Sequence, residues 1–431
     1  MKASRVLLIV VLFVTSLTFG VLYVYRYVYQ KDLLPNTASV SRTTADAAAA
    51  TDVTPQPVVP AVTYSVLPRL SYTYDGVTVG VTGTKGREDL VDYYAFGGHV
   101  FAILSTDTDG EDYRAEGRSL AVARFDTQCT LVDTVTLPKS VGYAYLAACM
   151  YDYGLLIAAV SASDVRVWSV SVNLAVRTTA YPYVCQAGAM IYAEGGAVLA
   201  LSGDKLHLLS VDADLATRWY HAVPVGSERV VTAYAVGDVY VVLTTDASAG
   251  SAYTFDKSGY RTRSVLPAIT AVTPYASGYA VASQKEGALC FFDAHFTRTG
   301  ALPISARGNT YLAAYDKGIL LTVGTAGYLL CNHGDVQYTF ALPEGVTAPP
   351  VYWGDRFYFA VAEGATAAVY AYKPYTESPV AVASYVGAAS PRIWPMDGYL
   401  YCLCASDFDY GYYAGCIGGR DVYLLKSPLA W

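Results

Sequence analysis

The stretch from Val230 to Pro267 reads VVTAYAVGDVYVVLTTDASAGSAYTFDKSGYRTRSVLP and contains four apolar segments separated by turn residues. The first segment turns at Gly237-Asp238 into the second. A loop of Thr, Ser and Gly leads to the third, and Lys257-Ser258-Gly259 leads into the fourth. Glycine adopts a positive φ without a Cβ clash, and Asp or Ser can hydrogen-bond its own backbone, so each break has a physical cause. The stretch therefore predicts four antiparallel strands, which we call A to D.

This unit recurs along the chain, each time with an aromatic residue two to four positions before a glycine that opens an apolar run. The eight glycines are Gly98, Gly154, Gly196, Gly237, Gly278, Gly318, Gly354 and Gly398. Their spacings of 56, 42, 41, 41, 40, 36 and 44 residues match the period of roughly 40 to 50 residues typical of propeller blades. The sequence predicts an all-β, eight-bladed β-propeller of four-stranded antiparallel blades. Seven blades is the alternative if the wide first interval or the compressed seventh repeat is not a full blade.

Strand ends carry repeated signals of their own. Strand B is nearly all apolar in segments such as LLIAAV and ILLTV, which favours burial on both faces between neighbouring blades. Strand C closes on an Asp, at Asp126, Asp212, Asp256 and Asp293. Strand D stops at a proline, which cannot donate a ladder hydrogen bond; these prolines are Pro138, Pro224, Pro267, Pro303 and Pro343.

Ring closure is predicted from the two ends of the array. The last repeat reaches strand C at Asp421–Leu425, after which only KSPLAW remains, too little for a normal strand D. Val62–Pro68 (VTYSVLP) ends as the internal D strands do. We therefore expect an N-terminal strand at Val62–Leu67 to complete the last blade.

The N-terminus predicts one transmembrane helix. Val6–Tyr25 is uncharged, mostly apolar and long enough to cross a hydrocarbon core. A single N-terminal signal-anchor normally exports the domain behind it, so the expected organisation is a cytoplasmic stub at 1–5, a transmembrane signal-anchor at 6–25, a flexible tether at 26–61 and the propeller at 62–431. The protein is then a single-pass protein of the cell membrane with an extracytoplasmic propeller. The positive-inside bias is weak, because Arg26 and Lys31 follow the apolar run.

The amino-acid composition limits the classes of partner that the chain is expected to bind. Residues 1–31 hold four of the 29 Lys and Arg and none of the 36 Asp and Glu, so the remainder carries 25 cationic against 36 acidic side chains. Such a surface disfavours nucleic acid. Most of the eight cysteines lie inside apolar strands, where Cys behaves as a small hydrophobe, so they are expected to be free and buried, with Cys416 in a loop as the exception.

No catalytic signature is present. The five histidines are scattered over different repeats, and the chain has no GxSxG elbow, phosphate loop or dinucleotide fingerprint. A glycosidase needs two carboxylates facing one cleft, and the sequence leaves open whether any of its Asp residues pair in that way. The chain is therefore expected to be a binding protein rather than an enzyme, without a cofactor.

One predicted hairpin is similar to a hairpin of a known propeller group. Val211–Trp219 (VDADLATRW) resembles the C-to-D hairpin of quinoprotein-type propeller repeats, whose pattern is apolar, Asp, two variable residues, a small turn and Trp. Over about residues 62–431 the chain resembles the broad quinoprotein-like and WD-repeat-like propeller group through its repeat cadence. The other repeats lack that Trp, and there is no adjacent Cys-Cys of the quinone-dependent alcohol dehydrogenases. The resemblance implies the fold and an envelope scaffold without quinone.

Three insertions are expected to gather on one face, at the seam between blades 1 and 8: Ser105–Ser119, Ala405–Arg420 and Arg69–Glu88. Long loops on a rigid scaffold commonly carry binding. The partner-binding candidates are Tyr410, Tyr412, Tyr413, Asp407, Asp409, Asp109 and Glu116. Asp107, Asp109 and Asp112 surround a turn-forming glycine and are expected to form a solvated acidic loop, with a calcium site as the alternative.

These observations predict a scaffold or recognition module that binds a cell-envelope protein or a cell-wall glycan through this face. The alternative is a hydrolase or lyase that acts on envelope polysaccharide in the central funnel. Paired carboxylates and aromatic residues converging on the funnel would favour the enzyme, whereas small apolar residues there and a Tyr-rich rim would favour binding.

Overall fold

The computed structural model describes residues 71–74, 76–82, 87–107, 118–152, 154–275, 278–363, 366–376, 378–408 and 420–429. The chain divides into two units, Met1–Tyr64 and Ser65–Trp431, and every described residue belongs to the second. The predicted transmembrane segment at 6–25 and the tether at 26–61 lie outside the described residues. Within the described ranges no helix is long and apolar enough to cross a membrane.

The described strands form eight antiparallel sheets. Blade 1 contains β3 (Glu88–Phe96), β4 (His99–Asp107), β5 (Arg118–Asp126) and β6 (Leu131–Thr136). Blade 2 contains β7 (Ala144–Tyr151), β8 (Gly154–Val160), β9 (Val165–Ser171) and β10 (Val176–Tyr181). Blade 3 contains β11 (Cys185–Ala193), β12 (Gly196–Gly203), β13 (Lys205–Asp212) and β14 (Thr217–Pro224). Blade 4 contains β15 (Arg229–Val236), β16 (Val239–Thr245), β17 (Ala249–Asp256) and β18 (Gly259–Pro267).

The second half of the ring continues the pattern. Blade 5 contains β19 (Ala271–Tyr275), β20 (Gly278–Ser283), β21 (Ala288–Phe292) and β22 (Arg298–Pro303). Blade 6 contains β23 (Thr310–Tyr315), β24 (Gly318–Val323), β25 (Ala326–Cys331) and β26 (Val336–Ala341). Blade 7 contains β27 (Val351–Trp353), β28 (Arg356–Glu363), β29 (Thr366–Tyr372) and β30 (Val380–Val386). Blade 8 contains β31 (Ala388–Met396), β32 (Tyr399–Ser406), β33 (Asp421–Pro428), β2 (Val77–Val81) and β1 (Ser71–Tyr74).

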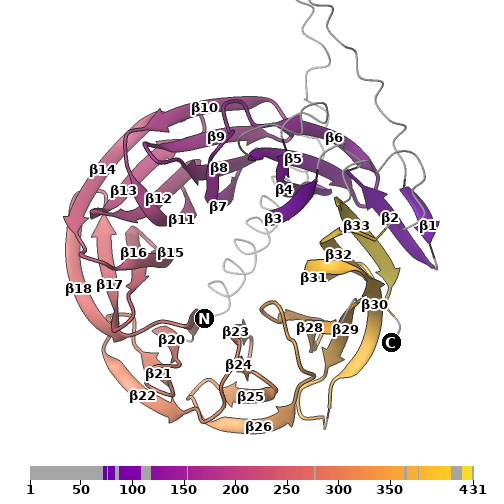
Figure 1. Ribbon diagram of the computed structural model, residues 1–431. Helices are drawn as coiled ribbons and strands as arrows, with labels where there is room; N and C mark the ends of the chain where they lie inside the picture. The colour runs from indigo at the N-terminus through magenta and orange to yellow at the C-terminus, as the bar shows by residue number, and fades with distance from the viewer. Residues whose placement is uncertain are drawn as a thin grey trace, which may run out of the picture. The chain divides into compact units, whose positions relative to one another are not determined.

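The blades are arranged around a ring, with strand A of each blade on the inside and strand D on the outside (Figure 1). The prediction of eight four-stranded blades is confirmed for the first seven, and the eighth carries a fifth strand. The compressed seventh repeat forms a full blade. The first interval is wide because it contains the long B-to-C connection of blade 1, which is also a full blade.

Closure is achieved by a different strand from the one expected. Strand β2 pairs with β33, with Val79 opposite Leu425, and β1 pairs with β2 on the outside. An N-terminal strand therefore does complete the last blade, but the assignment to Val62–Leu67, which lies outside the described residues, is wrong. Val77–Val81 (VTVGV) is short and carries a glycine, a residue more typical of loops than of strands, so the sequence pattern does not mark it as a strand.

The apolar core lies between neighbouring blades. Strands β8, β12 and β24 are buried over nearly their whole length, as their all-apolar sequences predicted. At the seam, Val100 and Ala102 of blade 1 pack in one cluster with Leu403 and Leu424 of blade 8. The seam therefore has a core of the same kind as the other blade interfaces.

The repeat glycines serve two separate purposes. Gly237 has a φ of +59° in the A-to-B turn, where a side chain would be strained. At Gly196 an added Cβ would instead overlap the carbonyl oxygen of Val211 on strand C. The sequence signal is thus one pattern with two causes, turn conformation and close approach of adjacent strands.

The strand-end signals have the expected structural basis. The Asp212 carboxylate accepts hydrogen bonds from the backbone N–H groups of Asp214 (3.0 Å) and Ala216 (2.9 Å) in the C-to-D turn. Asp126 and Asp293 close their turns in the same way. VDADLATRW is therefore a C-to-D hairpin, as predicted.

The cysteines of the described ranges are free, as predicted for the buried ones. Only Cys331 among these seven is more than slightly exposed. Burial raises the pKa of the Cys129 and Cys149 thiols to about 12, which leaves little thiolate at neutral pH. Cys416 lies outside the described residues.

Candidate functional site

The B-to-C and D-to-A connections share one face of the ring. In an antiparallel blade strands B and D run in the same direction, so both end at the same edge. We call this edge the B–C face, and the edge that carries the A-to-B and C-to-D turns the opposite face. The described strands place the long B-to-C connections at 108–117 and 407–420, in blades 1 and 8, whereas connections such as 161–164 and 284–287 are short.

The third predicted insertion needs correction. Nine of the twenty residues of Arg69–Glu88 form β1 and β2, and only 82–87 connects β2 to β3. Connection 342–350, between β26 and β27, is longer and lies elsewhere on the ring. The seam is therefore distinguished by its two B-to-C loops rather than by an enlarged D-to-A connection.

Backbone hydrogen bonds join the bases of these connections. The N–H of Glu88 donates to the carbonyl of Arg420 (2.8 Å), and the N–H of Asp107 donates to that of Arg87 (3.3 Å). The N–H of Thr82 donates to the carbonyl of Val422 (3.1 Å). Segments from both ends of the chain are thus fixed against one another where the two long loops begin and end.

An ion-pair network overlies these backbone contacts. Asp89 of β3 forms ion pairs with Arg118, at the start of β5, and with Arg420 (3.0 Å), which precedes β33. The same arginines lie near Asp107 (3.4 Å) and Asp407 (3.7 Å). Arg118 also donates to the carbonyls of Ser105 (2.7 Å) and Arg87 (3.0 Å). Each long loop therefore has an arginine at one end that is held by Asp89.

A buried carboxylate lies beneath this network. Glu88 is fully buried, and its carboxylate accepts a hydrogen bond from the hydroxyl of Thr82. The Thr82 hydroxyl also accepts a hydrogen bond from the N–H of Val422 (3.2 Å). A buried carboxylate is costly without such donors, and the segment that closes the ring, from β1 to Thr82, supplies one of them to Glu88.

The predicted partner-binding residues and the calcium candidates are only partly described. Asp107 and Asp407 lie at the seam with more than half of each side chain exposed. Tyr410, Tyr412, Tyr413, Asp409, Asp109, Asp112 and Glu116 lie outside the described residues. Among the residues that are described, no group of three His, Cys, Asp or Glu could hold a metal, and Asp107 of the calcium candidate has Arg118 as its neighbour.

The inner strands bear on the enzymatic alternative. Across the eight described A strands the acidic residues are Glu88, Asp89 and Asp92, all on β3, and the remaining A strands are rich in Ala and Tyr. Asp92 accepts a hydrogen bond from Tyr145 (2.5 Å) of β7. Burial, aided by the charge of Asp92, raises the pKa of the Tyr145 hydroxyl far above its usual value. No second carboxylate faces Asp92 from another described A strand.

Sequence reasoning missed Asp89, Arg118 and Arg420. Each borders a connection that was identified, and the signal was present: an arginine occurs at or just before the first residue of strand C in both repeats with long loops. In the middle repeats strand C begins without such an arginine, for example at Ala249 and Ala288.

Comparisons with known proteins agree with the fold. No family model and no curated protein matches the chain. Among solved structures it is similar to the Dos1 propeller, at 13% identity over 79% of this chain and 93% of that chain, with a TM-score of 0.56. It is also similar to Raptor of Chaetomium thermophilum (11% identity, 81% and 29% of the two chains, TM-score 0.45) and to BBS1N in complex with ARL6DN (12%, 66% and 93%, TM-score 0.43). At such identities the likeness to the Dos1 propeller supports a β-propeller in general and not the quinoprotein-like group in particular.

Proposed function

We propose that this chain is a binding or scaffold module that recognises an envelope protein or a cell-wall glycan on the seam of its B–C face. The observation that carries the proposal is the fixed base of both long loops, where Arg118 and Arg420 converge on Asp89. Loops held at both ends on a rigid scaffold lose less entropy on binding than free segments.

The composition of the loops favours a polar or basic partner. The two loops and their ends contribute Asp107, Asp109, Asp112, Glu116, Asp407 and Asp409, together with Tyr410, Tyr412 and Tyr413. Tyrosine offers a large rigid contact surface with a polar tip, and acidic side chains around it would attract cationic groups. Calcium at Asp107, Asp109 and Asp112 remains a secondary proposal.

Binding is favoured over hydrolysis of an envelope polysaccharide. Glycoside hydrolysis requires two carboxylates that flank the scissile bond, and the acidic residues of the described A strands are confined to β3. The finer resemblance to quinoproteins supports no cofactor chemistry here, because the residues that carry it form a hairpin turn stabilised by Asp212.

The binding proposal is tested by replacing Tyr410, Tyr412 and Tyr413 with Ala in the full-length chain. With the chain kept in detergent, retention on cell envelopes from which detergent has removed the lipid should fall several-fold with an unchanged melting temperature, because aromatic anchors dominate binding and loop tips bury little. The matched control replaces Tyr192, Tyr260 and Tyr375, which are exposed and belong to the opposite face. Loss of retention after protease treatment of the envelopes identifies a protein partner, and persistence identifies a glycan. Equal retention by both triple variants would reject the proposal.

The membrane anchor is a separate part of the proposal. We propose that residues 6–25 cross the membrane and that the propeller lies outside the cytoplasm. Protease added to intact cells should then release a fragment that begins within the tether at 26–61. Protection of the propeller until the cells are lysed would contradict this orientation without affecting the binding surface.

A further inference from the structure

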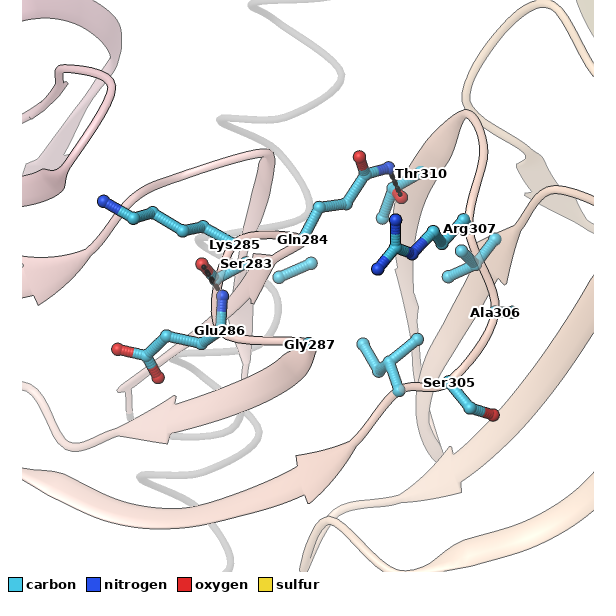
Figure 2. A pocket seen from close by; sticks show the side chains of 12 residues that line it. Ser283, Gln284, Lys285, Glu286, Gly287, Ser305, Ala306, Arg307 and Thr310 are labelled. Carbon is cyan, nitrogen blue, oxygen red and sulfur yellow. Dashed lines mark hydrogen bonds between the residues drawn. The ribbon is translucent and has the colours of Figure 1, made fainter.

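A second site lies on the B–C face, between blades 5 and 6. An open cavity of about 470 Å³ lies between the B-to-C turn of blade 5 (284–287) and the D-to-A connection 304–309. Its size falls within the range of small-molecule sites, roughly 300 to 1,000 Å³. Figure 2 shows the two loops facing each other across this space.

The walls of the cavity are braced by hydrogen bonds. The side-chain amide of Gln284 donates to the carbonyl of Gly308 and to the hydroxyl of Thr310 (2.8 Å), so it joins the two loops. The N–H of Ile304 donates to the carbonyl of Gly287 (2.7 Å). The cavity is therefore built by contacts between the blades.

The charges around the cavity are unequally satisfied. Glu286 forms an ion pair with Arg298 (3.4 Å), and the ammonium of Lys285 donates to the carbonyls of Ala247 (3.2 Å) and Ser248 (3.1 Å) of blade 4. Arg307 is exposed and forms no hydrogen bond or ion pair with any residue in the described part of the chain. Its guanidinium extends from its own loop towards the facing turn (Figure 2).

The remaining lining is small and apolar. Ala282 and Val323 are buried, and Ile304 and Ala306 are half-buried. A planar guanidinium matches a carboxylate through two parallel hydrogen bonds, and the small apolar wall leaves space for a short aliphatic group beside it. A phosphate would need further cationic side chains in the cavity, and the nearby ammonium of Lys285 is directed to blade 4 instead.

We propose that this cavity is a carboxylate-binding site, in which Arg307 binds the carboxylate of a short acidic peptide segment or a peptide C-terminus. The site is separate from the seam and does not rest on the function proposed for it. The charge of this site is opposite to that of the seam loops: the seam is acidic, whereas the cavity carries the guanidinium of Arg307, which is unpaired among the described residues.

The test measures peptide binding to the full-length chain by titration calorimetry at low salt. The probes are acetyl-Ala-Asp-Ala-amide, its Asn counterpart, acetyl-Ala-Ala-Ala with a free carboxylate, and inorganic phosphate. At least one carboxylate probe should bind about tenfold or more tightly than the Asn peptide, consistent with a charge-assisted pair. The stronger carboxylate probe identifies the source of the carboxylate.

Three variants assign the binding to this cavity. Arg307→Gln should weaken the carboxylate probe about tenfold or more, and Ala306→Tyr should abolish binding by filling the space while retaining the charge. Arg177→Gln, at an exposed arginine of β10, should bind as the unaltered chain does. Unchanged binding by Arg307→Gln, equal binding of the Asp and Asn peptides, or binding of phosphate alone would overturn the proposal.

Discussion

Two buried glutamates at the same position of their blades show how the seam differs from the middle of the ring. Glu228 precedes strand A of blade 4, and its carboxylate accepts hydrogen bonds from Thr244 (2.5 Å), Ser251 (2.9 Å) and Tyr253 (3.1 Å), all of the same blade. Glu88 begins strand A of blade 1. Its carboxylate accepts a hydrogen bond from Thr82 of the closing segment, and its N–H donates to the carbonyl of Arg420 of blade 8.

The difference has a covalent origin. In the middle of the ring each blade is tied to the next by the continuous chain, so the polar groups can satisfy one another within a blade. At the seam β2 joins β33 only through hydrogen bonds and packing. The opposite face repeats this arrangement, since Tyr401 (3.1 Å) and Lys426 (3.0 Å) of blade 8 both donate to the carbonyl of Thr127 of blade 1. The seam therefore depends on contacts between segments remote in sequence.

The largest effect is expected from removing the closing strand. Deletion of residues 1–82 removes β1 and β2 and exposes the ladder edge of β33, whose first six residues are buried. An unpaired edge of this kind promotes aggregation, so the truncated chain should aggregate or lose its cooperative thermal transition. Deletion of residues 1–64 retains both strands and should leave the melting temperature nearly unchanged. Equal melting temperatures for the two chains would show that closure does not depend on β2.

A single substitution in the closing strand should give a smaller but clear effect. A Cβ added at Gly80 would overlap the carbonyl oxygen of Cys129, in the C-to-D turn of blade 1. Gly80→Ala should therefore separate β2 from blade 1 and destabilise the fold by about 2 kcal/mol, as overpacking commonly does. Gly300→Ala on the outer strand β22, where the nearest atom would be 3.8 Å away, is the control. Denaturant unfolding of both variants measures the difference, and equal stability would refute the close contact.

How far the sequence predicted these features depended on whether the pattern was repeated. The blade number, the four-stranded unit and the Asp-capped turns followed from signals present in many copies. The closing strand was misplaced because β2 occurs once, is short and contains Gly80. The ion network at Asp89 was missed because a partnership between positions 89 and 420 depends on ring closure, and no local pattern encodes it.

The ion pairs at the seam should contribute less than the closing strand. Asp89 and Arg118 are about one-third exposed, and Arg420 is more buried. Arg420→Gln and Arg118→Gln should each lower the free energy of unfolding by about 0.5 to 1 kcal/mol, near the upper range for exposed pairs. Because both arginines share Asp89, the double variant should be non-additive. Arg177→Gln, in a more exposed pair with Asp214, should have almost no effect on stability. Additive losses in urea denaturation would show that the two arginines act independently.

The most direct test of the binding surface is site-specific photo-crosslinking in the native cells. A photoreactive phenylalanine derivative replaces Tyr412 on the seam loop in one full-length chain and exposed Tyr260 on the opposite face in another. If the seam is the working surface, Tyr412 should give a discrete adduct with a protein or glycan, and Tyr260 should give none. A discrete adduct from Tyr260 alone, or the same adduct from both positions, would contradict a binding role for the seam.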